Sequence, residues 1–202
     1  MAAAFDFTTL ARVKEMLSAD YGTSTSNDAF LTSLISSVST RVEQLMGRKV
    51  DAIERTEVYS LSARQQSVEL CNWPVSAVSE VKVSISGEFA TATAYNSNSY
   101  RFDGEDGYLR FGSPPIRSGF GWNVAQVTYT GGMAADASAL QTNFADLADA
   151  VTRQVVHAFK KRDNPGASSE TFRGSDRKFE GAYGLLPDLV SLVATYRRLP
   201  IG

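Results

Sequence analysis

The chain has 202 residues, of which 43% are hydrophobic and 21% charged, and its formal net charge is −2. This length fits one domain, or one domain with an insertion, and the composition is too apolar for a wholly disordered chain. The near-neutral charge gives no overall attraction to nucleic acid or to a membrane. One cysteine and one histidine exclude an internal disulfide, a Cys₂ or Cys₄ zinc site and a two-histidine metal site. We expect no cofactor, no signal peptide and no membrane span.

The first fifty residues are predicted to form two helices. Thr8 or Thr9 can cap a helix over residues 10–17, in which apolar residues recur at i, i+3 and i+7. Ser26 or Asn27 can cap a longer second helix, whose apolar stripe continues to Met46. The glycine that follows Met46 suits the C-terminal end of this helix.

From Val50 to about Thr130 the hydrophobic period is nearer two, and turn residues recur every eight to twelve positions. Asp103 to Gly107 predicts a hairpin turn. In the strictly alternating segment 79–86, residues Val81, Val83 and Ile85 are expected on one face. The predicted strands cover residues 54–61, 67–71, 79–86, 100–102, 108–111 and 124–129.

Helix returns near Ser138, and an apolar stripe from Leu140 to Phe159 is the strongest amphipathic pattern in the sequence. Lys160, Lys161 and Arg162 then suit a helix C-terminus. We expect an exposed or mobile loop over residues 163–186, which are polar and glycine-rich. Pro187 opens a short last helix, whose apolar face includes Leu189, Leu192, Val193 and Tyr196.

The order of elements predicts an α+β fold. None of the helices can bury its apolar stripe alone, so the economical arrangement is a mainly helical bundle formed by the two chain ends, residues 1–50 and 133–202. Residues 51–132 would form an inserted antiparallel β-region. A flexible loop at about 163–186 and a terminal tail complete the predicted organisation.

The charges are unevenly distributed along the chain. Residues 1–50 have no net charge, residues 51–150 carry six basic and twelve acidic side chains, and residues 151–202 carry nine basic and five acidic ones. An acidic middle and a basic end favour a protein that presents different faces to different neighbours, although random surface variation also produces such a pattern.

Candidate catalytic and metal-binding residues are weak, so we predict that the protein is not an enzyme. His157 has no Ser, Cys or acid placed with it by a known motif, and Cys71 is a free cysteine of the kind that is usually buried and inert. Asp103, Glu105 and Asp106 resemble a calcium loop only superficially, because the position that needs a glutamate is a proline. No Walker A, HExxH or GxSxG motif is present.

Several segments, in order, resemble the head–tail connector proteins of tailed bacteriophages, also called adaptor or head-completion proteins. Residues 10–17 are similar to the family's VKxxL helix, and the second helix is similar to its LxxLI and IExxxGR segments. Residues 70–83 and 124–132 resemble its LPxxPVxxVxSVxV and VxVTYTAGY strands. Residues 185–198 resemble its closing LPxxVxxLLxxYRR.

This resemblance implies a structural virion protein that is assembled in the host cytoplasm. It implies a ring of copies, usually twelve, beneath the portal at the capsid vertex, which continues the DNA channel without sequence-specific DNA binding and receives the next neck or tail protein. The C-terminal part of such proteins commonly reaches the portal. We therefore predict a portal interface formed by Tyr196, Arg197, Arg198, Leu199, Pro200 and Ile201; a frayed terminus is the alternative.

A channel through which DNA slides should not grip phosphate strongly, so an acidic or neutral lumen is a further hypothesis. Under this hypothesis, some acidic residues of the strand region face the lumen or the next ring. The candidates are Glu54, Glu57, Glu80, Glu88, Asp103, Glu105 and Asp106.

Two other functions stay open from the sequence. One is a different neck or tail component, such as a tail terminator, which would contain less helix at its ends. The other is a DNA-binding assembly factor that contacts phosphates through residues 160–162 together with Arg173, Arg177 and Lys178.

Overall fold

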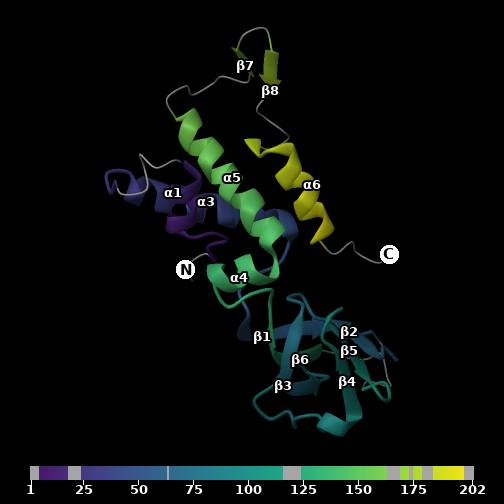
Figure 1. The fold of residues 1–202 in the computed structure, drawn as a ribbon. Helices are drawn as coiled ribbons and strands as arrows, with labels where there is room; N and C mark the ends of the chain where they lie inside the picture. Colours follow the sequence, from purple (N-terminus) through teal and green to yellow (C-terminus); the bar gives the residue numbers. More distant parts are fainter. Residues whose placement is uncertain are drawn as a thin grey trace. The chain divides into compact units, whose positions relative to one another are not determined.

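The computed structural model describes residues 5–17, 24–62, 64–115, 124–162, 169–172, 175–178 and 184–197. The chain divides into two compact units (Figure 1). The first, called the helical unit here, comprises Met1–Arg48 and Asp136–Gly202, and the second, called the β-unit, comprises Lys49–Ala135. The predicted α+β class is therefore confirmed. Within the described residues, no helix is long and apolar enough to cross a membrane.

The helical unit is organised around its longest C-terminal helix. Helix α5 (Ala145–Lys161) contacts α1 (Leu10–Leu17), α3 (Asp28–Met46), α4 (Ala137–Asn143) and α6 (Pro187–Thr195). Its buried side chains meet those of the other helices in a core that excludes water. The core side chains include Phe7, Val13, Leu31, Ile35, Val42, Leu140, Leu147, Val151, Val155, Phe159, Leu189 and Val193.

Local sequence signals explain where these helices begin and end. The Thr9 hydroxyl accepts a hydrogen bond from the Arg12 amide at 3.3 Å and so caps α1. Gly47 ends α3 in the left-handed conformation, with φ of 71°, which glycine adopts without strain. Pro187 occupies the first turn of α6, where its missing N–H costs nothing.

The predicted continuous helix from Ser138 to Phe159 is wrong in one respect, because Phe144 separates α4 from α5. Phe144 has a non-helical backbone (φ −137°, ψ 56°), although its position fits the apolar stripe. The Asp136 side chain accepts a hydrogen bond from the Ala139 amide at 2.8 Å and starts α4 separately. A break of one residue changes the direction of the helix but leaves the spacing of the apolar residues almost intact. The hydrophobic period of the sequence therefore does not indicate this break.

The β-unit contains two three-stranded sheets. One has the order β1-β6-β3, formed by Ile53–Ser60, Val124–Gly131 and Val75–Ser84, and the other has the order β2-β5-β4, formed by Ser67–Glu69, Tyr108–Phe111 and Tyr100–Asp103. All four strand pairings are antiparallel. Ser97–Ser99 forms one short 3₁₀ turn before β4.

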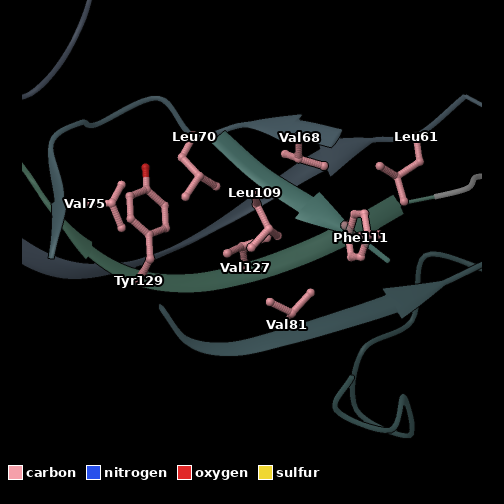
Figure 2. Packing of buried hydrophobic residues seen from close by; sticks show 10 residues of the cluster. Leu61, Val68, Leu70, Val75, Val81, Leu109, Phe111, Val127 and Tyr129 are labelled. Atoms are coloured by element: carbon pink, nitrogen blue, oxygen red, sulfur yellow. The ribbon is translucent and has the colours of Figure 1, made fainter. Parts of the chain in front are cut away.

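A single hydrophobic core fills the β-unit. Figure 2 shows Val127 and Tyr129 of β6, Leu109 of β5 and Val81 of β3 gathered in this core. Alternation along β6 is strict, because every second residue from Ala125 to Gly131 is buried. The remaining buried members of the cluster are Leu61, Val68, Leu70, Val75, Phe111 and Ala125.

The predicted hairpin at Asp103 to Gly107 is confirmed, since β4 and β5 pair on either side of it. The Asp103 carboxylate accepts hydrogen bonds from the amides of Glu105 and Asp106 and so fixes the turn. The expectation that Ile85 shares the face of Val81 is wrong, because β3 ends at Ser84 and the Ile85 side chain is 62% exposed.

The segment 163–186, expected as a loop, contains an antiparallel pair of short strands. They are β7 (Ser169–Phe172) and β8 (Ser175–Lys178). Strand pairing satisfies backbone groups without a large apolar face, so a polar composition alone does not exclude it. Apart from these strands and residues 184–186, that loop prediction lies outside the described residues.

Candidate interaction surfaces

The described residues hold no group of His, Cys, Asp or Glu side chains that is able to bind a metal ion. His157 is half-buried on α5. Cys71 is exposed, which corrects the expectation of burial. Partial desolvation, followed by the nearby Glu57 carboxylate, raises the pKa of the Cys71 thiol. A higher pKa lowers the thiolate fraction near neutral pH, so this environment does not activate Cys71 as a nucleophile.

Tyr196, the first residue of the predicted portal interface, is bound within the helical unit. Its hydroxyl donates to the Asp146 carboxylate, with both oxygens at 2.9 Å. Its ring meets Phe144 edge-on, with a centroid distance of 5.9 Å. The Asp146 carboxylate also accepts a hydrogen bond from the Leu147 amide at 2.8 Å, in the first turn of α5. Tyr196 therefore anchors the end of α6 to the start of α5.

This anchor predicts a pH-dependent contribution to stability. Burial and the hydrogen bond to Asp146 raise the pKa of Tyr196 to about 12, above its ordinary value of about 10. The neutral hydroxyl is thus favoured in the folded state, and its contribution is complete below about pH 10 and lost as the pH rises through about 12. We expect Tyr196→Phe to cost about 1 kcal/mol at neutral pH. Urea unfolding of both proteins followed by circular dichroism should show this difference vanish near pH 12; a constant difference would contradict it.

The structure describes only the first two residues of the predicted portal interface. Arg197 follows Tyr196 and is exposed. Arg198, Leu199, Pro200 and Ile201 lie outside the described residues. Arg197 therefore lies directly after the Tyr196 anchor, at the end of α6.

The acidic residues proposed for a channel lumen do not share one environment. Glu88, Glu105 and Asp106 are exposed, whereas Glu80 forms an ion pair with Lys82 at 2.9 Å. Glu54 accepts a hydrogen bond from the Ser79 hydroxyl at 2.5 Å. The set therefore contains both solvated carboxylates and carboxylates with partners on the protein.

Glu57 is the clear exception, since it is half-buried and its carboxylate binds groups inside the β-unit. Tyr129 donates to it at 2.7 Å, Asn72 donates through Nδ2 at 2.8 Å, and the Tyr59 hydroxyl donates as well. Burial and the bond to Glu57 raise the pKa of both tyrosines, so both remain neutral donors. A carboxylate that accepts hydrogen bonds from three donors stabilises the fold. These hydrogen bonds account for an acidic residue at position 57 without a role in a channel lumen.

The unit boundaries also reduce the acidic excess expected for the strand region. Residues 49–135 contain seven basic and nine acidic side chains, a net charge of only −2. Asp136, Asp146 and Asp149, which contributed to the acidic middle of the sequence, belong to the helical unit. The acidic character is therefore shared between the two units and is not a property of the β-unit alone.

A groove in the helical unit lies between residues of α1, α5 and α6. Its volume is about 450 Å³, and it is lined by Met16, Asp146, Asp149, Ala150, Arg153, Asp188 and Leu192. Asp149 reaches Arg12 at 3.5 Å, and Met16 is 36% exposed. Sequence reasoning missed this surface because its residues come from three separate helices; the only signal was the polar i, i+3, i+7 spacing of Asp146, Asp149 and Arg153.

The described residues thus form two compact units, with a mixed acidic and apolar groove in the helical unit. The comparison with protein families assigns the chain to a specific class, because the model named head completion protein matches residues 6–199. The chain belongs to the head completion protein family. The expected relationship to head–tail connector, or head-completion, proteins is thereby confirmed.

Solved structures with the same fold come from gene transfer agent particles. A chain from the neck of an empty particle, computed with C6 symmetry, is 14% identical with a TM-score of 0.64, and covers 97% of this chain and 93% of its own. A chain from the virion of a native particle is 20% identical with a TM-score of 0.58, at the same coverages. A chain from the neck of a native particle, computed with C12 symmetry, is 16% identical with a TM-score of 0.57, and the alignment covers 96% of this chain and 91% of that one. No curated protein matches the sequence.

Proposed function

We propose that the protein forms an oligomeric ring, of about twelve copies, beneath the portal of a tailed-phage capsid. The ring joins the DNA-filled head to the tail, continues the DNA channel and receives the next neck protein. Membership in the head completion family over residues 6–199 carries this proposal. The neck origin and the C6 and C12 symmetries of the similar solved structures support a ring, because rotational symmetry repeats one subunit contact around an axis.

The terminal segment is the proposed attachment to the portal. Arg197 is exposed, and the residues after it combine a second arginine with Leu199, Pro200 and Ile201. Arginine is among the residues that most often dominate the binding energy of a protein interface. Because Tyr196 is held by Asp146 at the end of α6, the segment is tethered at one defined point of the helical unit.

We expect charge reversal in this segment to weaken portal binding without unfolding the protein. The double substitution Arg197→Glu with Arg198→Glu should weaken capture by the portal at least about tenfold, because it places acidic groups where the partner accepts basic ones. The matched control is Arg101→Glu with Arg110→Glu, an identical change of charge on two exposed residues of the β-unit. If the portal captures the two double variants equally well, the terminal segment is not part of the portal interface.

Native mass spectrometry of the purified protein, alone and mixed with the portal of the same particle, tests the function itself. We expect a ring near twelve copies, or capture on the portal in that ratio. A protein that stays monomeric or dimeric and ignores the portal would leave only the family fold. Binding of DNA by the free protein that is tight and salt-sensitive would instead favour a DNA-binding assembly factor.

A further inference from the structure

We propose that neighbouring copies in the ring contact each other through the groove between α1, α5 and α6 of one copy and the outer face of α3 of the next. This inference rests on the proposed ring, and it names the surfaces that close it. The two surfaces belong to the same unit, so their relationship within one copy is fixed by the packing of α3 on α5.

The groove supplies an acidic and apolar receptor. Asp188 is exposed and has no ion-pair or hydrogen-bond partner among the described residues, and Asp149 has only the 3.5 Å contact with Arg12. Met16 and the half-buried Leu192 add apolar surface beside these carboxylates. With Asp146 and Arg153 also present, the lining holds three acidic groups and one basic group. A segment with a basic and an apolar side chain on one face therefore complements it.

The outer face of α3 has this chemistry. Arg41 is exposed and has no ion-pair or hydrogen-bond partner among the described residues, and the half-buried Leu45 follows it one turn later. Ser37, Thr40 and Gln44 lie on the same shallow surface and add small or uncharged contacts. An exposed helix face with a basic and an apolar residue at i and i+4 suits insertion into a groove between helices.

The two surfaces point away from each other, as a closed ring requires. On α5 the groove residues Asp146, Asp149 and Arg153 lie on the side opposite the core residues Val151 and Val155, and the fourth groove residue of this helix, Ala150, is buried. On α3 the centre of the surface, Thr40 and Gln44, lies opposite the buried stripe of Leu31, Ile35, Val38, Val42 and Met46, and Arg41 and Leu45 lie at the edge of that surface. Because α3 packs against α5 and lies behind it in Figure 1, the outer sides of the two helices face in opposite directions.

This geometry matches a head-to-tail interface. In a ring, every copy uses one surface toward the preceding neighbour and a different one toward the following neighbour, so the two must lie on opposite sides of the subunit. An isologous dimer would instead need one self-complementary patch. The groove carries an acidic excess and the α3 face a basic group, so contact of either surface with itself is disfavoured electrostatically.

A charge swap tests the contact. Arg41→Asp and Asp188→Arg each place like charges across the proposed interface, so each should raise the protein concentration at half-maximal ring formation at least about tenfold. The double variant restores opposite charges and should return to within about threefold of the wild type. Native mass spectrometry with and without the portal measures the ring, and circular dichroism establishes that each variant is folded. Arg101→Asp in the β-unit is the matched control and should leave assembly unchanged.

Disulfide trapping provides a second measurement. In a Cys71→Ser background, Leu45→Cys combined with Leu192→Cys should give a ladder of covalently linked copies on mild oxidation, while either single cysteine should give no ladder. The inference would be overturned if the wild type assembles, both charge variants assemble as well as the wild type does, and the double-cysteine variant gives no ladder. That result would leave the proposed ring intact. A wild type that never associates, alone or on the portal, would overturn both.

Discussion

Replacing Tyr129 by alanine is expected to destabilise the β-unit by about 4 kcal/mol, because it empties the centre of that core. Tyr129 is fully buried among Leu70, Val75 and the other members of the cluster, while its hydroxyl bonds Glu57 and accepts from the Asn72 amide at 3.1 Å. The change therefore removes ring packing and leaves polar groups without their partner.

Two phenylalanine variants separate these contributions. Tyr129→Phe keeps the ring and should cost about 2 kcal/mol through the lost hydrogen bonds to Glu57 and Asn72. Tyr100 also packs against the core, but its hydroxyl has no hydrogen-bond partner among the described residues, so Tyr100→Phe should change stability by less than about 0.5 kcal/mol. Both tryptophans of the chain fall within residues 49–135, so fluorescence during urea unfolding reports this unit. Equal losses in the two phenylalanine variants would contradict a stabilising role of the Glu57 cluster.

Gly131→Ala is expected to cost about 3 kcal/mol or more, the second large effect. A Cβ at this position would overlap the Asn72 carbonyl oxygen and lie 2.8 Å from the Tyr129 ring. The first of these neighbours is backbone and cannot rotate away, so β6 or the segment before Pro74 must shift. Unfolding followed by tryptophan fluorescence measures the loss.

Gly112→Ala is the matched control for this substitution. A Cβ at Gly112 would meet only the Ser99 carbonyl oxygen at 3.5 Å, an ordinary contact. We expect this variant to stay within about 1 kcal/mol of the wild type. A Gly131→Ala protein as stable as the Gly112→Ala protein would show that β6 does not pass as close to Asn72 as described.

Local signals in the sequence predicted most of the elements. The helix over residues 28–46 was predictable because a polar start, an unbroken apolar stripe and Gly47 agree with one another. The hairpin at Asp103 was predictable because its turn chemistry is local. The helix break at Phe144 and the strand pair within 163–186 were not predictable, since the first preserves the hydrophobic period and the second depends on backbone pairing with no apolar signature.

The surfaces were much less accessible to sequence reasoning. The resemblance directed attention to Tyr196, yet only the structure shows its hydroxyl on Asp146, fifty residues earlier in the chain. Glu57 appeared as one acidic residue among seven, because its donors Tyr129 and Asn72 become neighbours only through the pairing of β1 with β6 and the approach of the loop before Pro74. Relationships between distant segments are tertiary, and a local pattern does not encode them.

The two ends of the β-unit lie side by side. The chain enters this unit at Lys49 and leaves it at Ala135. Next to these two ends, the Met133 amide donates to the Val50 carbonyl at 2.7 Å and the Ala52 amide donates to the Ala134 carbonyl at 2.8 Å. Entrance and exit are thus a few ångströms apart, like the two ends of an inserted cassette. A change in the length of such a cassette, or its replacement, leaves the spacing between Arg48 and Asp136 in the helical unit unaltered.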